Sequence, residues 1–267
     1  DDLSELFTIY WALVDPPSLR GNIAMPLYHL ESDNFWHLLP REGYEERLKY
    51  GGKIHSIRKL RETVYGAKLD DNLYELLQQQ EARDTLRTVL INTYFAPELR
   101  QRLIHQGKIN LESYFYSQDL LAQVKEQKIK ETAVPEQEYA VRDQGFKRTM
   151  RRIYDHRCAL CGIRVKTAEG HTAVVGAHII PWAISHNDDP RNGLSLCRLC
   201  HWTFDEGLMT VNLSYVVRTS PQLNSLGNMA AHLALLNQRG MIRPDDPDFL
   251  PDPDSLSWHM EKVFRRH

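Results

Sequence analysis

The spacing of apolar residues predicts a mainly helical first half of the chain. Apolar residues recur at three- and four-residue steps over residues 73–77 and 86–94, as on one face of a helix. Leu120, Leu121 and Val124 start a further amphipathic stretch. The short apolar runs 28–30 and 35–39 lie on either side of a polar turn, and this pattern predicts a β-hairpin.

A polar stretch, residues 125–138, separates two regions that are each long enough to bury a core. The chain has 267 residues, which suggests two domains at roughly 150 residues per domain. Linkers are commonly polar and contain proline, and Pro135 lies near the end of this stretch. We therefore place a linker at residues 133–140, between an N-terminal domain (1–132) and a C-terminal domain (141–267).

In the C-terminal domain the pattern predicts a helix, two strands and a second helix, in that order. A basic amphipathic helix starts at Val141. The β-branched content of residues 162–165 and 172–180 suits the two strands of a hairpin. Apolar residues within 202–208 fit a short helix, and residues 254–264 predict a closing helix with a capping start.

Composition argues against a mainly disordered chain and against an integral membrane protein. Apolar residues make up 42% and charged residues 25% of the chain, which is ordinary for a globular protein. No apolar run approaches the roughly 18 residues of a membrane helix, so we expect no membrane association. The formal net charge is −2, so the chain is no polycation, and any affinity for nucleic acid must come from local basic patches such as residues 147–152.

The four cysteines form two Cys-x-x-Cys pairs, Cys158 with Cys161 and Cys197 with Cys200. Two such pairs complete a closed tetrahedral site, so we expect a structural Zn²⁺ ion. The alternatives are disulfides or a redox pair. Because no secretory signal follows Asp1, we expect a cytoplasmic protein, in which thiols stay reduced, and a second redox pair would be redundant.

Between the two pairs lie His178, Asn192 fourteen residues later and His201 nine residues after that. His178 stands in Ala-His-Ile-Ile-Pro, Asn192 begins Asn-Gly-Leu-Ser-Leu, and His201 begins His-Trp-Thr-Phe-Asp. This order and spacing resembles the His-Asn-His motif of HNH nucleases, over about residues 145–220. The resemblance implies a ββα-metal fold with a catalytic Mg²⁺ or Mn²⁺ ion, and it assigns His178, Asn192 and His201 to catalysis.

Phosphodiester hydrolysis explains why such residues are needed. A neutral imidazole accepts a proton from water near neutral pH, so His178 is the candidate general base. A divalent cation neutralises charge that develops on the phosphate, and His201 is its candidate ligand. Asp205, one helical turn further on, is a second candidate ligand, although it can instead bond the amides of a turn. Asn192 either fixes the loop facing His178 or contacts the metal.

One position departs from the family pattern. Many HNH nucleases place an aspartate directly before the general base as a metal ligand, and this chain has Ala177 there. The geometry of the catalytic metal is therefore left open. The departure also keeps open an alternative in which the domain binds DNA without cleaving it.

The N-terminal half resembles a second family. The segment from Asn22 to Leu38, together with residues 73–77 and 92–95, is similar to the sulfur-binding domain of McrA-type HNH nucleases. The resemblance covers about residues 5–105. That domain reads phosphorothioate DNA, in which sulfur replaces a backbone oxygen. The resemblance implies an apolar sulfur pocket and places four residues on or next to it. These are Pro26 and His29, with Met25 and Tyr28 as neighbours.

Two alternatives remain for this half: Pro26, Tyr28, Phe35 and Trp36 can simply pack a core, and the domain can sense a modified base. The family also has a basic, histidine-containing helix that would lie before Asp1, so we expect an N-terminally incomplete reader.

Together these patterns predict an α+β protein. Its N-terminal DNA-reading domain is mainly helical with a short hairpin, and its C-terminal ββα-metal domain carries a four-cysteine zinc site. We expect a metal-dependent restriction endonuclease acting on double-stranded phosphorothioate DNA, as a monomer or a homodimer. The basic residues expected to contact DNA are Lys147, Arg148, Arg151 and Arg152.

Overall fold

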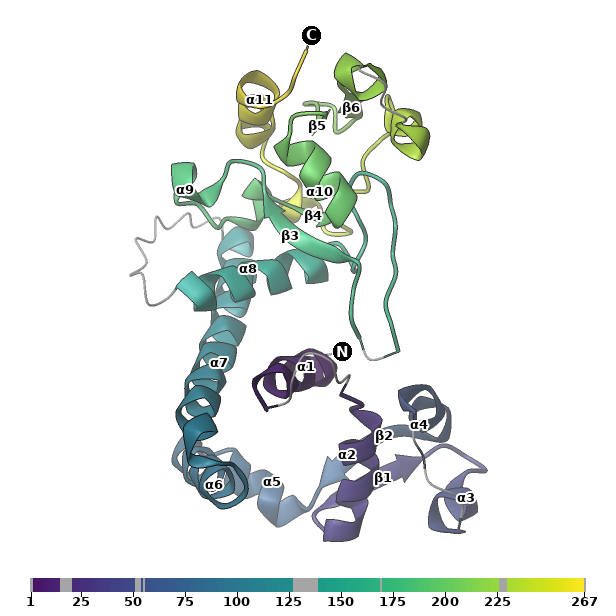
Figure 1. Ribbon diagram of the computed structural model, residues 1–267, viewed down its shortest axis with the longest axis vertical. Coiled ribbons are helices and arrows are strands. Elements are labelled where there is room, and N and C mark those ends of the chain that lie inside the picture. The colour runs from purple at the N-terminus through teal and green to yellow at the C-terminus, as the bar shows by residue number, and fades with distance from the viewer. Residues whose placement is uncertain are drawn as a thin grey trace. The chain divides into compact units, whose positions relative to one another are not determined.

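The computed structural model describes residues 2–14, 21–50, 54, 56–126, 139–168, 170–225 and 230–266, and it divides the chain into two compact units (Figure 1). One unit comprises residues 1–108 and 167–171, and the other comprises residues 109–166 and 172–267. Helix α7 (Pro97–Lys125) contributes residues to both units. The predicted linker, 133–140, lies mostly outside the described residues, so its position stays a prediction.

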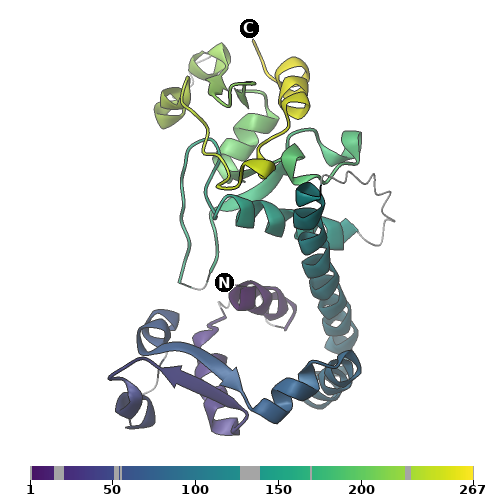
Figure 2. The same cartoon turned by 180° about the vertical axis from the view of Figure 1, so that it is seen from behind.

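The first unit is mainly helical, with one two-stranded antiparallel sheet (Figure 2). Strand β1 (Trp36–Pro40) pairs with β2 (Val64–Leu69), and Trp36 lies opposite Leu69. Ile23, Leu38 and Leu60 pack together in its core. The helices of this unit, besides the first part of α7, are α1 (Asp2–Val14), α2 (Ala24–His29), the 3-10 helix η1 (Leu30–Asp33), α3 (Glu45–Tyr50), α4 (Ile57–Thr63), α5 (Asp71–Leu77) and α6 (Gln80–Tyr94).

The predicted hairpin at residues 28–39 is wrong in its first strand. Residues 28–30 lie in the helices α2 and η1. Asn22 starts this helical segment, because its side-chain oxygen accepts from the Ala24 amide and its carbonyl oxygen accepts from the Met25 amide. The predicted second strand is β1, but its partner is the distant strand β2. Helices α5 and α6 confirm the predicted helical spacing. Leu120, Leu121 and Val124 end the long helix α7 instead of starting a new one.

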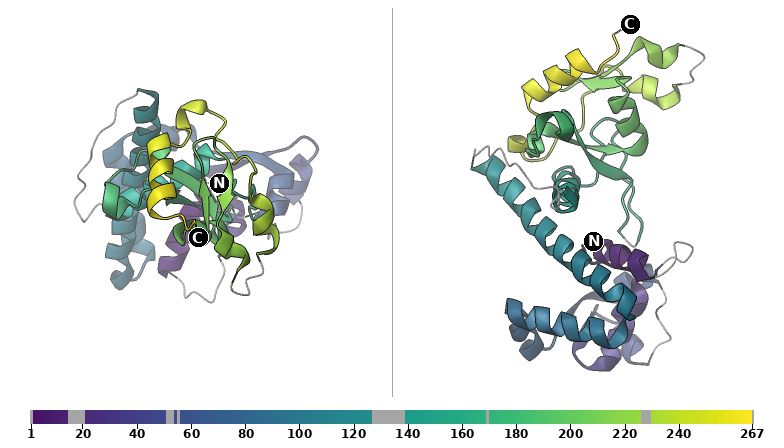
Figure 3. Two further views of the ribbon diagram at one scale, coloured as in Figure 1. Left: turned by 90° about the horizontal axis from the view of Figure 1, so that it is seen from above. Right: turned by 60° about the vertical axis from the view of Figure 1, so that its left-hand side comes forward.

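The second unit places an antiparallel strand pair between two helices (Figures 1 and 3). Its elements, besides the second part of α7, are α8 (Tyr139–Ile153), β3 (Val174–His178), α9 (Trp182–Ser185), η3 (Pro190–Asn192), β4 (Gly193–Cys197), α10 (Arg198–Asp205), β5 (Met209–Val211), β6 (Val217–Thr219), η4 (Pro221–Asn224), η5 (Ala231–Leu236), η6 (Pro247–Phe249) and α11 (Pro253–Lys262). Strand β3 pairs with β4, and α8 and α10 both pack against this pair. Two strands followed by a helix are present, but only β3 falls on a predicted strand: residues 162–165 form no strand, and β4 was not predicted.

The pairing of the predicted strands is corrected. Strand β3 lies within the predicted strand 172–180, but its partner is β4 and not residues 162–165, which precede only an isolated bridge between Lys166 and Thr172. Burial explains the choice, because β4 is almost entirely enclosed and packs against α8. Gly193 permits the close approach, since a Cβ atom there would lie 2.7 Å from Met150 Sδ.

The closing helix α11 holds a buried histidine, and this yields a stability prediction. The His259 ring stacks on Phe204 at 3.6 Å between centroids, and its Nδ1 lies 2.8 Å from Thr210 Oγ1. Burial lowers the pKa of His259 to about 4. As pH falls, the unfolded chain therefore takes up a proton on this histidine before the folded protein does. The stabilising contribution of the neutral His259 ring is complete above about pH 6.5 and is lost as pH falls towards 4. The loss amounts to about 3 kcal/mol at most.

This prediction is checked by chemical denaturation between pH 7 and pH 4. We expect His259→Gln to flatten the loss of stability relative to the wild type. His232→Gln, which changes an exposed histidine in the same unit, should keep the wild-type slope. Equal slopes for the wild type and the His259 variant would contradict the assignment.

Candidate active site

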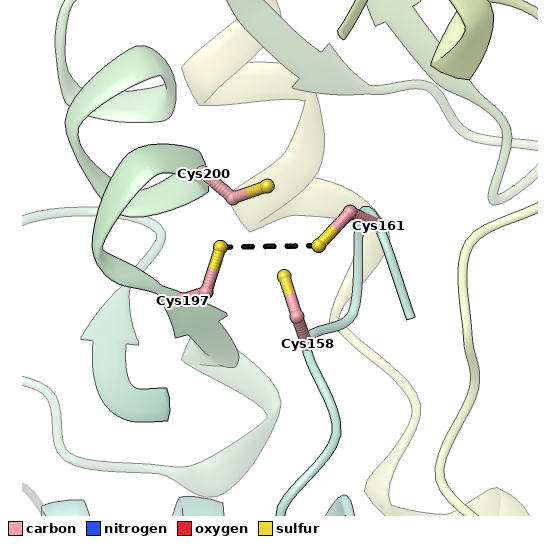
Figure 4. A group of neighbouring side chains, drawn as sticks. All are labelled: Cys158, Cys161, Cys197 and Cys200. Atoms are coloured by element: carbon pink, nitrogen blue, oxygen red, sulfur yellow. Dashed lines mark hydrogen bonds between the residues drawn. The ribbon is translucent and has the colours of Figure 1, made fainter. Parts of the chain in front are cut away.

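The four cysteines gather at one place in the second unit (Figure 4). Cys158 and Cys161 lie in the turn after α8, Cys197 ends β4, and Cys200 lies in α10. Their sulfur atoms all lie within 4.8 Å of one another, and all four are free thiols. Gly162, with φ of +78°, allows the tight turn that brings the first pair together. The cluster can therefore hold a metal ion, and the disulfide alternative does not fit it.

Contacts among the thiols favour ionisation of part of the cluster. The hydrogen bond with Cys158 lowers the pKa of Cys161 to about 7, and the same contact raises the pKa of Cys158. The pKa of Cys197 is also lowered, first by its contact with Cys158. Because metal ions bind thiolates and displace the remaining protons, a donor set of four closely spaced sulfur atoms fits Zn²⁺.

His178 stands at the end of β3 and is held on two sides. Its ring stacks on Phe146 of α8, with centroids 3.8 Å apart and an angle of 6° between the planes. Its Nε2 lies 2.7 Å from Asp188 Oδ1. The side chain keeps 16% of its surface exposed, so a substrate can still reach it.

Asp188 is a site residue that the sequence analysis missed. Its carboxylate is buried, and it accepts hydrogen bonds from Arg142 Nη1 at 2.6 and 2.9 Å and from the Tyr116 hydroxyl at 2.8 Å. Burial alone raises the pKa of Asp188, but hydrogen bonds from His178 and Arg142 outweigh it and hold the pKa below its usual range. Nothing in the sequence around Asp188 indicates that this aspartate is buried, because it lies in a polar loop. The only signal is its position between His178 and Asn192.

Asn192 is fully buried and holds the loop that follows β3. Its Oδ1 accepts a hydrogen bond from the Ile180 amide at 2.9 Å. Its Nδ2 donates to the carbonyl oxygens of Ile180 and Asn187, both at 3.1 Å. Of the two roles considered for Asn192, this geometry favours fixing the loop over contacting a metal.

His201 and Asp205 lie one turn apart on α10, with Nε2 and Oδ2 separated by 3.3 Å. Both side chains are partly exposed, at 34% and 57%. One nitrogen and one oxygen donor at this spacing fit two ligands of a divalent ion. Ala177 is buried in the hydrophobic core, so that strand position offers no ligand.

The expected DNA-reading residues lie on helix α2 of the first unit. Tyr28 and His29 line a pocket of about 570 Å³, together with Glu31 and Glu45. Pro26 is exposed and, like Met25, lies outside the lining of this pocket. The core-packing alternative holds in part for Tyr28, which packs against the core of this unit.

The expected basic contacts lie along α8. Arg152 is exposed, whereas the side chains of the other three are partly buried. Lys147 pairs with Asp143 at 2.7 Å, Arg148 lies over the Tyr114 ring at 5.7 Å, and Arg151 Nε donates to the Lys147 carbonyl oxygen.

An antiparallel strand pair followed by a helix, with the histidines on these elements and a four-cysteine cluster beside them, defines a nuclease site of the ββα-metal class. Comparison with known families agrees: residues 158–212 match the HNH endonuclease family model. Residues 13–111 match the ScoMcrA-like DNA sulfur-binding domain. The chain thus carries an HNH endonuclease domain and a DNA sulfur-binding domain where the sequence predicted them.

Part of the chain is also similar to a solved structure. A solved structure described as the modification-dependent TagI restriction endonuclease is 25% identical over 44% of this chain, with a TM-score of 0.33. The match covers 37% of that chain. No curated protein matches this chain. Among the helices in the described ranges, none is both long and apolar enough to cross a membrane.

Proposed function

We propose that this protein is a metal-dependent endonuclease that hydrolyses double-stranded DNA carrying phosphorothioate linkages. The observation that carries the proposal is the presence, in one chain, of an HNH endonuclease domain and a DNA sulfur-binding domain. The first supplies hydrolysis of a phosphodiester, and the second supplies the choice of DNA. Restriction of DNA takes place inside the cell, so the proposal places the protein in the cytoplasm.

In this proposal each candidate site residue of the HNH domain has one role. His178 takes the proton from the attacking water, and Asn192 keeps the loop after β3 in place. His201 and Asp205 would hold Mg²⁺ or Mn²⁺, which supplies positive charge beside the scissile phosphate when bound. The four cysteines would hold a structural Zn²⁺ ion. Lys147, Arg148, Arg151 and Arg152 contact backbone phosphates and give affinity without sequence preference.

Selection for sulfur follows from solvation. A phosphorothioate sulfur is larger and less strongly hydrated than oxygen, so it enters an apolar pocket at low cost. A phosphate oxygen would lose its water there, at a cost of roughly 1 to 3 kcal/mol. Since 1.4 kcal/mol is a factor of ten, we expect about ten- to hundredfold preference for phosphorothioate DNA. Pro26 and His29 on α2, with Met25 and Tyr28 beside them, are the residues proposed for this contact.

The test is cleavage of matched phosphorothioate, methylated and plain duplexes at fixed salt, with Mg²⁺ or Mn²⁺. We expect the phosphorothioate duplex to be bound and cut first, and Pro26→Gly to reduce the ratio between duplexes more than it reduces cleavage of plain DNA. Preference for the methylated duplex would instead favour a reader of modified bases. Binding without cleavage under every metal would favour a DNA-binding protein with an inactive nuclease fold.

A further inference from the structure

We propose that Asp188 is the positioning residue that sets the tautomer of His178, and that Arg142 and Tyr116 hold Asp188 in place for this task. The inference rests on the proposed function, because it assigns His178 as the base. It adds a buried network that reaches from β3 to helices α7 and α8 and that the HNH motif itself does not contain.

The first step concerns the direction of the hydrogen bond between His178 and Asp188. An ionised carboxylate only accepts hydrogen bonds, so the imidazole must carry its proton on Nε2, which lies 2.7 Å from Oδ1. Nδ1 of the neutral ring then keeps its lone pair. A base needs such a lone pair, since the opposite tautomer would place a proton on the nitrogen that has to accept one.

The second step concerns what keeps Asp188 ionised and fixed. Arg142 donates to both carboxylate oxygens, and the two side chains are only 3% and 4% exposed. The Tyr116 hydroxyl donates to Oδ2 at 2.8 Å. Trp182 covers the Arg142 guanidinium at 4.2 Å. Removing this carboxylate from water is costly, and here the cost is offset by the Arg142 charge, whose Nη1 donates to both oxygens, and by a hydroxyl.

The third step separates this role from metal binding. An ionised carboxylate has about four lone-pair sites. Oδ1 accepts from Arg142 and His178, and Oδ2 accepts from Arg142 and Tyr116. All of these sites are therefore in use, and Asp188 does not replace the ligand that Ala177 fails to supply. The charge of Asp188 acts on the edge of the imidazole ring at Nε2, and Phe146 stacks on the face of the ring and fixes its plane.

A structural role alone makes a different prediction. If the Arg142–Asp188 pair merely tied α8 to the loop after α9, a substitution of Asp188 that still folds would leave the imidazole tautomer and the cleavage step unchanged. If Asp188 positions His178, both must change. Asparagine keeps the size of the side chain but removes the charge, and its NH₂ group favours the opposite tautomer whenever it faces His178.

The experiment uses the full chain and two readouts. Long-range ¹⁵N–¹H NMR of histidine-labelled protein at pH 8, with His178 assigned from a His178→Gln variant, reports the tautomer without DNA. Single-turnover cleavage and DNA binding report the reaction. We expect the Nε2–H tautomer in the wild type. In Asp188→Asn we expect the Nδ1–H form to appear and cleavage to fall by on the order of 10²- to 10⁴-fold, with affinity within about twofold.

Asp189→Asn is the matched control. Asp189 undergoes the same chemical change one residue along, but it bonds Arg191 and does not contact His178. It should keep the wild-type tautomer and rate. An Nδ1–H tautomer in the wild type overturns the proposal even if Asp188→Asn fails to fold, and so does a folded Asp188→Asn protein with the wild-type tautomer and rate. An Nε2–H tautomer in a wild type that cuts no DNA supports the positioning but removes the proposed function.

Discussion

His178→Ala should abolish DNA cleavage and leave DNA affinity nearly unchanged. The substitution removes the proton acceptor, and a positioned general base contributes about 10²- to 10⁴-fold to rate. It leaves the basic side chains of α8 in place, and these contact backbone phosphates in the proposal. The fold should survive, because Asp188 keeps its bonds to Arg142 and Tyr116 when the imidazole is gone.

The measurement is single-turnover cleavage with saturating enzyme, together with a binding assay in Ca²⁺ or without metal. His186→Ala is the control, since it removes an exposed histidine eight residues along the chain. We expect the control to cut at the wild-type rate. Weakened binding with full turnover on the DNA that remains bound would show that His178 contacts DNA and is not the base.

The candidate site residues were predictable where local spacing fixes the geometry. Two Cys-x-x-Cys pairs can close only a small site, and the sulfur atoms do lie within 4.8 Å of one another. His201 and Asp205, four residues apart on a helix, must share a face, and their ligand atoms are 3.3 Å apart. Helix α10 alone brings His201 and Asp205 together, and a local turn does the same within each cysteine pair. The two pairs are 36 residues apart along the chain, and their meeting was predictable because a closed metal site needs all four thiols.

Contacts between distant segments were not predictable in the same way. The strand partner of β1 begins more than twenty residues later, and that of β3 follows a loop and a short helix. Short apolar runs do not specify their partners, because pairing depends on which faces become buried together. The Arg142–Asp188 pair joins residues 46 apart, and Tyr116 lies 72 residues from Asp188. Each of these polar residues by itself is typical of a solvent-exposed surface.

The four-cysteine cluster should be essential for folding of the second unit. It ties together the turn after α8, the end of β4 and the start of α10, which are the elements that place His178 and His201. Cys158 and Cys200 are completely buried, so the cluster is part of the core as well as a candidate metal site. Binding of a structural Zn²⁺ ion contributes on the order of 10 kcal/mol, which is comparable to the whole stability of a domain.

Cys158→Ser should therefore yield protein that is insoluble or unfolded in this unit. Serine leaves three sulfur ligands and a hydroxyl that stays protonated at neutral pH, so the bound metal is lost with most of its stabilisation. The measurements are zinc content per chain, with about one ion expected in the wild type, and thermal unfolding. Chelation of the wild type should reproduce the effect of the variant, and added Zn²⁺ should reverse chelation but leave Cys158→Ser unfolded. Soluble and active wild-type protein without zinc would exclude this role, since the core around Cys158 and Cys200 would then hold the strand pair and α10 together unaided.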